Sequence, residues 1–422
     1  MTDKANFRAY KWEGILTFYR SEETHAFHDS INWDALCQYA SKLNNDEPCT
    51  MDPQTTMGGR NLIRIVNFEN GTRWIARFRI ASSDARANEG FARVLQEEVD
   101  YMQLVKERTS IPVPTVFGYI ADPQNNIGAS FMLIECFLGN TAASLDHEAP
   151  MSSQQRKAFY ADIASIQTEM SSLTFPKIGT LIRLQDGSYD IGPLPGLGGP
   201  FDTATEYLEA WAEAAQFPNL ESVRESCVGA AGGKAVDDKD TEERISRLEA
   251  SILAFPSRLK KLAVNVPLRN NGPFPLIHSD FAPWNILVDD DYKVLGVIDW
   301  EFSHTGPWEM VHFFMGFMPT PAPMAPPEWY DDAGMPLRDN LKETFREMKE
   351  YVDVVRQVER AKGLSPTLSA VLSDRAGQDL AFAMRLYAVN GKHGYYSRIL
   401  DVHHERWGGG NKGLGGSIAL SE

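Results

Sequence analysis

The stretch IHSDFAPWN places Asp280 and Asn285 five positions apart, between two apolar runs. Two further apolar runs follow Asn285, at residues 286–288 and 294–298, and Asp299 comes directly after the second. If the residues between Asn285 and Asp299 form a hairpin centred at Tyr292, antiparallel pairing sets Asn285 opposite Asp299. Amide and carboxylate oxygens suit Mg²⁺, which commonly takes one or two ligands from protein and the rest from water and phosphate. The spacing therefore predicts a divalent-cation site at the open end of the hairpin.

A carboxylate held beside such a cation has the chemistry that phosphoryl transfer needs, because it can orient an attacking hydroxyl group and receive its proton. Asp280 is the candidate for this role. Taken singly, Asp280 could instead cap a turn and Asp299 could end a strand, but their joint spacing favours a chemical site. His278 lies among apolar residues, which favours a role in bracing the loop by hydrogen bonding.

Two β-like runs surround the dipeptide Asn70-Gly71, which is typical of a tight hairpin. Counting back from this turn sets Val66 opposite Ile75 and places Arg77 on the same face as both. The pattern therefore predicts an antiparallel pair of strands with one arginine on a partly apolar face.

The segment 91–108 has a helical period, with Glu98 in the middle of its apolar stripe. A buried unpaired carboxylate costs several kcal/mol or more, so Glu98 is expected to have a partner, and Arg77 is the candidate. The alternative is that both side chains are exposed. A first helix is predicted over Ser30–Leu43 with Ser30 as its N-cap, and most of the chain after Ser152 has helical periodicity.

The 422 residues are enough for two or more domains with a full core. Four scattered cysteines lack the paired spacing of a zinc site and are too few for a disulfide scaffold, so we expect reduced thiols. The net charge of −16 argues against nucleic-acid or membrane binding and would suit a positively charged small substrate. Because no secretory signal or membrane-spanning run is recognisable, we expect a cytoplasmic protein.

The motif HSDFAPWN, followed by VIDWE, resembles the signatures of the aminoglycoside phosphotransferase and choline kinase superfamily. The wider pattern GGRN…GTRWIARF…EEV…IPVP…MLIECFLG resembles fungal proteins that carry this phosphotransferase domain, and the resemblance covers most of the chain. It implies an α+β, two-lobed protein-kinase-like fold. The expected lobes are a small antiparallel-sheet lobe, residues 1–137, and a larger, mainly helical lobe, residues 138–422.

Carried over by position, the resemblance makes Asp280 the catalytic base and makes Asn285 and Asp299 the Mg²⁺ ligands. The implied reaction is ATP-dependent phosphorylation of a hydroxyl group on a small molecule. The identity of that molecule and the oligomeric state are not implied.

The same resemblance implies a nucleotide site in the smaller lobe. Gly58 and Gly59 match the loop that covers the phosphates, where glycine lets the backbone approach the nucleotide. Glu98 matches the helix carboxylate that braces the phosphate-binding cation. The residues around Glu135 and Phe137 match the hinge whose backbone meets adenine.

Arg77 stands where kinase-like enzymes typically carry a lysine. Arginine is always charged and forks onto carboxylate or phosphate, but it is bulkier than a lysine ammonium group. Two alternatives therefore stay open: a catalytically silent kinase-like binding protein, or pseudokinase, and a repurposed kinase-fold enzyme of secondary metabolism that performs a non-kinase reaction. Nucleotide binding without turnover would identify the first, and product formation without nucleotide the second.

Overall fold

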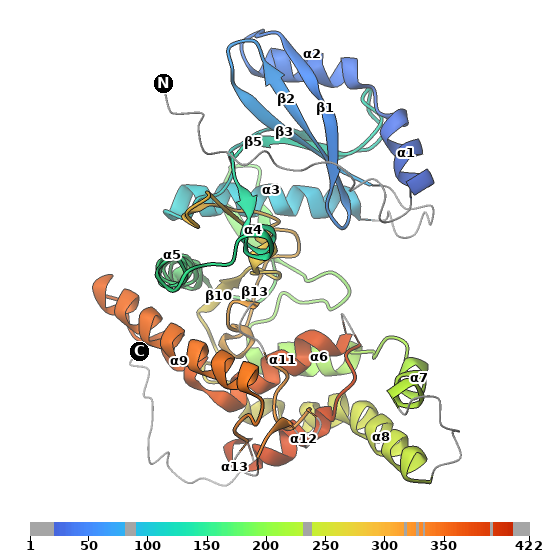
Figure 1. The fold of residues 1–422 in the computed structure, drawn as a ribbon, viewed down its shortest axis with the longest axis vertical. Coiled ribbons are helices and arrows are strands. Elements are labelled where there is room, and N and C mark those ends of the chain that lie inside the picture. Colours follow the sequence, from blue (N-terminus) through green and yellow to red (C-terminus); the bar gives the residue numbers. More distant parts are fainter. Residues whose placement is uncertain are drawn as a thin grey trace. The chain divides into compact units, whose positions relative to one another are not determined.

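The computed structural model (Figure 1) describes residues 21–80, 90–230, 239–315, 319–325, 329–331, 334–388 and 391–407. These residues form two compact units. Unit 1 contains the described residues of Met1–Asp162, Leu181–Tyr189 and His278–Ser303, and unit 2 contains the others. The units do not follow the predicted boundary between residues 137 and 138, because residues 278–303 group with the N-terminal part. That lobe boundary stays a prediction.

Unit 1 is built on a five-stranded antiparallel sheet with the strand order β1-β2-β3-β5-β4. Its helices and strands are α1 (Ser21–Ser30), α2 (Trp33–Leu43), β1 (Cys49–Met57), β2 (Asn61–Phe68), β3 (Arg73–Arg79), α3 (Phe91–Arg108), β4 (Val116–Ile120), β5 (Phe131–Glu135), β6 (Asn140–Thr141), α4 (Ala142–Glu148), β11 (Ile286–Val288) and β12 (Val294–Val297). This sheet confirms the antiparallel N-terminal part predicted from the sequence.

The two faces of β3 carry different side chains, because successive residues of a strand point to opposite faces. Trp74, Ala76 and Phe78 are buried in an apolar cluster together with residues of α2. Arg77 and Arg79 lie on the opposite face, which looks toward α3. Figure 1 shows α2 and α3 on either side of this sheet. The sheet thus separates an apolar layer from a charged one.

The predicted register of the β2–β3 hairpin is wrong by one residue. Val66 pairs with Trp74 rather than with Ile75. The backbone N–H of Gly71 donates to the carbonyl of Phe68, and Gly71 has φ +86°, so the connection has one residue more than a two-residue turn. Arg77 shares its face with Ile75 as predicted, but Val66 lies on the other face.

The helix predicted over Ser30–Leu43 is α2, but it begins at Trp33, and its N-cap is a different residue. Ser30 is the last residue of α1, and its hydroxyl donates to the carbonyl of Phe27. The side chain of Asn32 accepts from the backbone N–H of Ala35 and so caps α2. Ser30 ends α1 and its hydroxyl is bonded to Phe27, so Asn32 is the residue that caps α2.

The hairpin after Asp280 is present, with β11 between β12 and β6 in a three-stranded sheet. Its predicted register is also wrong by one residue, because the backbone N–H of Ile298 donates to the carbonyl of Asn285. The pairing shifts between Leu287 and Val288, and such an irregularity absorbs a residue from one strand. Asp299 therefore lies just beyond the ladder rather than opposite Asn285.

Unit 2 is mainly helical, as predicted for the chain after residue 152. Its helices and strands are β7 (Thr174–Phe175), α6 (Ala204–Ala214), α7 (Glu221–Ala230), α8 (Lys239–Leu262), β10 (Phe274–Ile277), β13 (His304–Thr305), α9 (Asp339–Ala361), α10 (Thr367–Ser373), α11 (Arg375–Ala388), α12 (Tyr396–Val402) and α13 (His404–Trp407). The helix α5 (Ser153–Ser172) and the strand pair β8 (Thr180–Arg183) and β9 (Tyr189–Gly192) contain residues of both units. Together with unit 1, these elements confirm the α+β class.

The predicted reduced thiols and the predicted lack of a membrane segment agree with the described residues. Cys37, Cys49 and Cys136 are free thiols, whereas the side chain of Cys227 lies outside the described residues. Among the described helices, none has the length and apolar character needed to cross a bilayer. The expected cytoplasmic location stays a prediction.

Candidate active site

His278 braces the loop that carries the predicted catalytic residues. The backbone N–H of Asp280 donates to its Nδ1 at 3.1 Å, and its Nε2 lies 3.1 Å from the carbonyl oxygen of Ile298. A neutral ring protonated on Nε2 satisfies both contacts, since Nδ1 then accepts and Nε2 donates. The ring is buried, and the bracing role predicted for His278 is confirmed.

Asp280 and Asn285 lie side by side in this loop. Nδ2 of Asn285 donates to Oδ2 of Asp280 at 2.8 Å and to the carbonyl oxygen of Asp280 at 2.9 Å. Nε1 of Trp284 donates to the same Oδ2 at 2.6 Å, a contact that sequence reasoning missed. Both contacts of Asn285 use its amide nitrogen, so its amide oxygen points away from Asp280 and can serve as a cation ligand.

Asp299 follows β12 with a left-handed backbone, φ +65°, a conformation that aspartate tolerates better than most residues. Its Oδ1 accepts from Nη2 of Arg77 at 2.9 Å. Burial raises the pKa of Asp299, Arg77 opposes that rise, and the negative charges of Glu301 and Asp280 add to it.

The predicted pair of Arg77 and Glu98 is present. Nη1 of Arg77 donates to Oε1 of Glu98 at 2.5 Å, and the two side chains are 11% and 1% exposed. Burial raises the pKa of Glu98 to about 7 against the lowering effect of Arg77, and the charges of Glu301 and Asp299 contribute to the rise. Arg77 does not cancel the effect of burial, and it also pairs with the other two carboxylates.

Sequence reasoning missed Arg79 and Glu301, which complete the ion pairs around Arg77. Oε1 of Glu301 accepts from Nη2 of Arg77 at 2.7 Å, and both carboxylate oxygens accept from Nη1 of Arg79 at 2.5 and 2.6 Å. Burial alone would raise the pKa of Glu301, but the charges of Arg77 and Arg79 outweigh it and lower that pKa. The period of two along β3 could have indicated Arg79, which follows Arg77 by two positions, whereas Glu301 lies outside the strands and had no such signal.

Asn61 lies beside this group and was also missed. Its Nδ2 is 3.3 Å from Oε1 of Glu301. In the reverse orientation of the amide, its oxygen accepts from Nε and Nη2 of Arg77 at 3.2 and 2.8 Å. In one orientation the amide of Asn61 donates to Glu301, and in the other it accepts from Arg77. In both cases Asn61 is a polar neighbour of a charged side chain.

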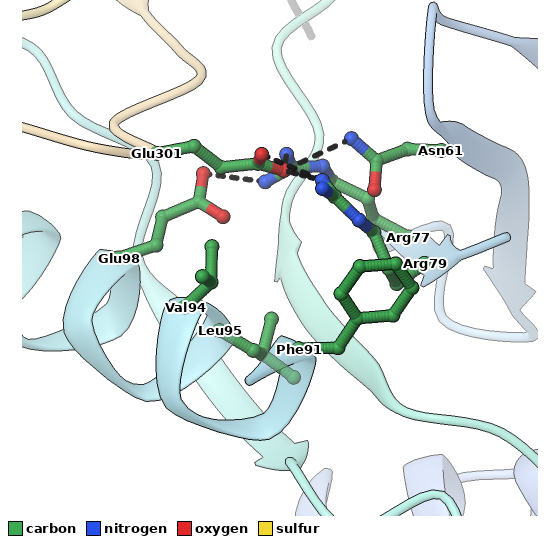
Figure 2. A pocket seen from close by; sticks show the side chains of 8 residues that line it. All are labelled: Asn61, Arg77, Arg79, Phe91, Val94, Leu95, Glu98 and Glu301. Carbon is green, nitrogen blue, oxygen red and sulfur yellow. Dashed lines mark hydrogen bonds and ion pairs between the residues drawn. The ribbon is translucent and has the colours of Figure 1, made fainter. Parts of the chain in front are cut away.

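These side chains form what we call the arginine–carboxylate cluster: Arg77, Arg79, Glu98, Asp299 and Glu301. Figure 2 shows four of these side chains, all but Asp299, pointing toward one another from β3, α3 and the segment after β12. The cavity that they line has a volume of about 10 Å³, which is room for about one water molecule. The cluster is therefore filled by its own side chains and is not itself a nucleotide pocket.

The charges and ligand types of this region fit a divalent cation. Asp280 and the cluster together carry four carboxylates and two guanidinium groups, a formal charge of −2 that one divalent cation would balance. Among the described residues, no group of three or more His, Cys, Asp or Glu is arranged to hold a metal ion. The roles of Asn285 and Asp299 as Mg²⁺ ligands stay a prediction, and the ion commonly takes only one or two ligands from protein.

Gly58 and Gly59 form the turn between β1 and β2. The backbone N–H of Gly58 donates to the carbonyl of Asn61 at 2.9 Å. A Cβ at either glycine would meet no atom within 4 Å, so open space surrounds this turn. The predicted phosphate-covering role of both residues stays a prediction.

Glu135 and Phe137, the predicted hinge residues, lie at and after the end of β5. Oε2 of Glu135 accepts from the backbone N–H of Thr115 at 3.0 Å and from its hydroxyl at 2.7 Å. The ring of Phe137 lies so close to Gly296 that a Cβ there would be 2.5 Å from it. Both side chains thus fasten the segment to its neighbours, and the predicted adenine contact of its backbone stays a prediction.

Comparison with known proteins identifies one family. The model of the phosphotransferase enzyme family matches residues 58–310, which is more than half of the chain. The matched stretch contains every residue of the candidate site. No curated protein sequence matches the chain.

Among solved structures, the chain is similar to several proteins at low identity. One is described as a fructosamine-3-kinase from Thermobifida fusca YX-ER1, with 15% identity over 89% of this chain and 99% of that chain, and a TM-score of 0.46. A macrolide 2'-phosphotransferase from Brachybacterium faecium has 12% identity over 90% and 99% of the two chains, with a TM-score of 0.39. An aminoglycoside phosphotransferase from Alicyclobacillus acidocaldarius has 12% identity over 84% and 89%, with a TM-score of 0.34. At these values the similarities support no argument about activity.

Proposed function

Because the chain belongs to the phosphotransferase enzyme family, we propose that it transfers the γ-phosphoryl group of ATP to a hydroxyl group of a small molecule. Family membership confirms the predicted resemblance and the predicted class of enzyme. Two contacts of the site carry the proposal: the amide of Asn285 donates to Asp280, and Arg77 donates to Asp299. These are the four residue positions that the reaction would need together.

Asp280 is the proposed catalytic base. Its Oδ2 is held by two donors, Trp284 and Asn285, so the plane of the carboxylate is fixed before an acceptor arrives. As the new bond from the acceptor oxygen to phosphorus forms and the bond to ADP breaks, the hydroxyl proton passes to Asp280. A weak base suffices, since a loose transition state lets the proton leave late.

Asn285 and Asp299 are the proposed Mg²⁺ ligands, and the ion when bound supplies positive charge that neutralises phosphate oxygens. Arg77 supplies a fixed positive charge next to them, braced by Glu98. A pre-positioned cation costs no reorganisation when charge develops on the transferring group.

The nucleotide would lie against the sheet of unit 1. The turn with Gly58 and Gly59 is the proposed cover of the phosphates, and the open space around both glycines supports this role. The backbone from Glu135 to Phe137 is the proposed contact for adenine. The acceptor is proposed only as a small molecule with a hydroxyl group.

The test compares two aspartates of the site with one outside it. Asp280→Asn and Asp299→Asn each remove a carboxylate without a change of size, and we expect phosphoryl transfer from labelled ATP to a panel of alcohols to fall by about 10²–10⁴-fold. Asp290→Asn is the matched control, because Asp290 lies in the turn of the same hairpin. We expect its rate to equal that of the wild type.

Binding and folding are measured on the same variants. We expect Asp280→Asn to retain ATP binding, since Asp280 acts on the acceptor, and thermal unfolding shows whether each variant is folded. Transfer at the wild-type rate by folded Asp280→Asn and Asp299→Asn proteins contradicts the proposal.

One observation favours a second candidate, a silent kinase-like binding protein. Nη2 of Arg77 lies 2.9 Å from Oδ1 of Asp299, so the guanidinium group contacts a carboxylate assigned to the metal ion. If this contact excludes the ion, ATP would stabilise the protein against thermal unfolding to the same extent with and without Mg²⁺, and no acceptor would be phosphorylated. A gain of transfer in Arg77→Lys would then identify the guanidinium group as the cause.

A further inference from the structure

Unit 2 contains a cavity of about 440 Å³ that the proposed reaction does not use. Residues of helices α9, α10 and α11 line it, together with Phe313, Pro319 and Pro321. Its volume lies within the range of about 300–1,000 Å³ that small-molecule sites usually have.

The floor of the cavity is apolar and buried. Phe313, Val352, Leu372 and Phe382 contribute the buried apolar side chains. Gln378 also reaches the floor, but its amide is committed to the backbone: Oε1 accepts from the N–H of Phe313 at 3.3 Å, and Nε2 donates to two carbonyl oxygens at 2.9 and 3.2 Å. The floor therefore favours an apolar body over a polar one.

The acidic group at the floor is paired within unit 2. Oδ2 of Asp379 lies 2.8 Å from Nε2 of His403, whose ring packs against Trp407. A hydrogen-bonded carboxylate of this kind is already satisfied and gives a cationic ligand less than an unpaired one would.

The rim of the cavity carries an excess of positive charge. Its exposed charged residues are three cations, Lys349, Arg356 and Arg375, and one anion, Asp353. Asp353 pairs with Arg356 at 2.7 Å, which leaves Lys349 and Arg375 as the excess. The carbonyl of Gly334 accepts from Nη2 of Arg375 at 2.8 Å and fixes that guanidinium group at the rim.

An apolar floor below two cations is complementary to one kind of molecule. We propose that this cavity binds a small apolar molecule that carries a carboxylate, with the apolar body on the floor and the carboxylate between Lys349 and Arg375. Arginine pairs well with a planar carboxylate because its donors match the two oxygens. This local charge is opposite to the net charge of −16, which by itself suits a cationic ligand. The site is assigned from unit 2 alone and stands independently of the proposed phosphoryl transfer.

The test uses three probes of one size and different charge: naphthalene-2-carboxylate, 2-naphthylmethanol and 2-naphthylmethylammonium. Titration calorimetry on the full chain should show the carboxylate binding at least about tenfold more tightly than the ammonium ion, with the alcohol between them, since opposite charge is favoured and like charge is disfavoured. Equal or tighter binding of the ammonium ion overturns the proposal.

Variants locate the binding. Lys349→Gln combined with Arg375→Gln lowers the net charge by two, and it should weaken the carboxylate by about tenfold or more and leave the alcohol within about twofold. Arg360→Glu is the matched control, an exposed cation on α9 outside the cavity, and should change neither probe. Loss of carboxylate binding in Arg360→Glu as well would assign the effect to the overall charge and overturn the site.

A steric variant tests the cavity itself. Ser373→Trp places a large ring at an exposed position that lines the cavity, and it should abolish the binding of all three probes. Ser365→Trp, exposed before α10 and outside the cavity, should leave binding unchanged. Both variants keep the wild-type charge and should unfold at the same temperature. Undiminished binding in Ser373→Trp places the probes elsewhere and rejects the proposal.

Discussion

The arginine–carboxylate cluster of unit 1 and the cavity of unit 2 differ in how much unfilled volume they contain and in how their charges are paired. The cluster fills its interior with paired charges and leaves about 10 Å³, whereas the cavity keeps about 440 Å³ open above an apolar floor. Charges that must act on a reacting group have to be held in place, and close pairing achieves this. A site for the body of a ligand needs unfilled volume instead. The two regions therefore have different weaknesses, which substitutions can expose.

The largest expected effect is in the cluster. Glu301→Ala leaves Arg77 and Arg79 without the carboxylate that they share, and removing one partner of a buried ion pair costs about 3–5 kcal/mol. We expect the free energy of unfolding, measured in urea, to fall by about that amount. Glu242→Ala is the control, because Glu242 and its partner Arg224 are 43% and 50% exposed and ion pairs screened by solvent in this way contribute little to stability. Equal losses in the two variants would show that the cluster does not depend on its pairing.

The helix and strand faces that carry this cluster could be predicted from the sequence, whereas the registers of the two hairpins could not. Periodicity placed Glu98 on the buried stripe of α3 and Arg77 on a partly apolar strand face, and the two side chains meet. Register depends on single residues with unusual backbone angles. Gly71 lengthens one turn by a residue. The other hairpin turns around Asp291 rather than Tyr292, and the irregularity at Val288 removes only part of that offset, so both predicted pairings were one residue off.

The predicted site residues depend on a local motif, and the missed ones depend on long-range contact. Asp280 and Asn285 are five residues apart, and their spacing alone indicated that they lie together. Glu301 and Arg77 are 224 residues apart in the sequence, so only the tertiary fold of unit 1 brings them together. A conserved pattern across relatives would have been needed to predict it.

A buried carboxylate of unit 2, Glu309, has no arginine partner among the described residues, and its effect on stability is expected to depend on pH. Glu309 is buried like Glu301, but its Oε1 accepts from the backbone N–H of Leu268 and no arginine pairs with it among the described residues. Burial raises its pKa to about 7, against the lowering effect of that N–H, from an ordinary value of about 4.5. The folded protein therefore holds this proton more tightly than the unfolded chain does.

The sign of the effect follows from that difference. The stability that Glu309 contributes is fully present below pH 4.5 and is lost as the pH rises through about 7, an amount of about 3 kcal/mol. Glu309→Gln cannot ionise, so its stability relative to the wild type should increase by about that amount between pH 4.5 and pH 8, measured by urea unfolding at each pH. A constant difference between the two proteins across this range contradicts the prediction.

A smaller effect on stability is expected when the guanidinium group of Arg77 is replaced by a lysine ammonium group. Arg77 uses two different nitrogens to reach three carboxylates, and a lysine ammonium group is a single point that cannot reproduce this fork. We expect Arg77→Lys to lower the free energy of unfolding by about 2 kcal/mol, the cost of a lost charged hydrogen bond. Arg79→Lys is the matched control, because Arg79 contacts Glu301 through one nitrogen, which a lysine can replace. An equal loss in both variants would mean that the fork is unimportant.

The smallest effect is expected at the wall of the cavity. Met348 lines the cavity and is half-buried, so Met348→Ala deletes atoms next to a space that is already empty. Its cost should stay under about 1 kcal/mol, whereas Leu380→Ala, in the fully packed core of the same unit, should cost about 2–5 kcal/mol in urea unfolding. A wall that tolerates truncation contributes little to folding, which is expected of side chains that contact a ligand instead. If Met348→Ala lowers the free energy of unfolding as much as Leu380→Ala does, the cavity is filled in solution. The cavity and the cluster would then not differ in unfilled volume.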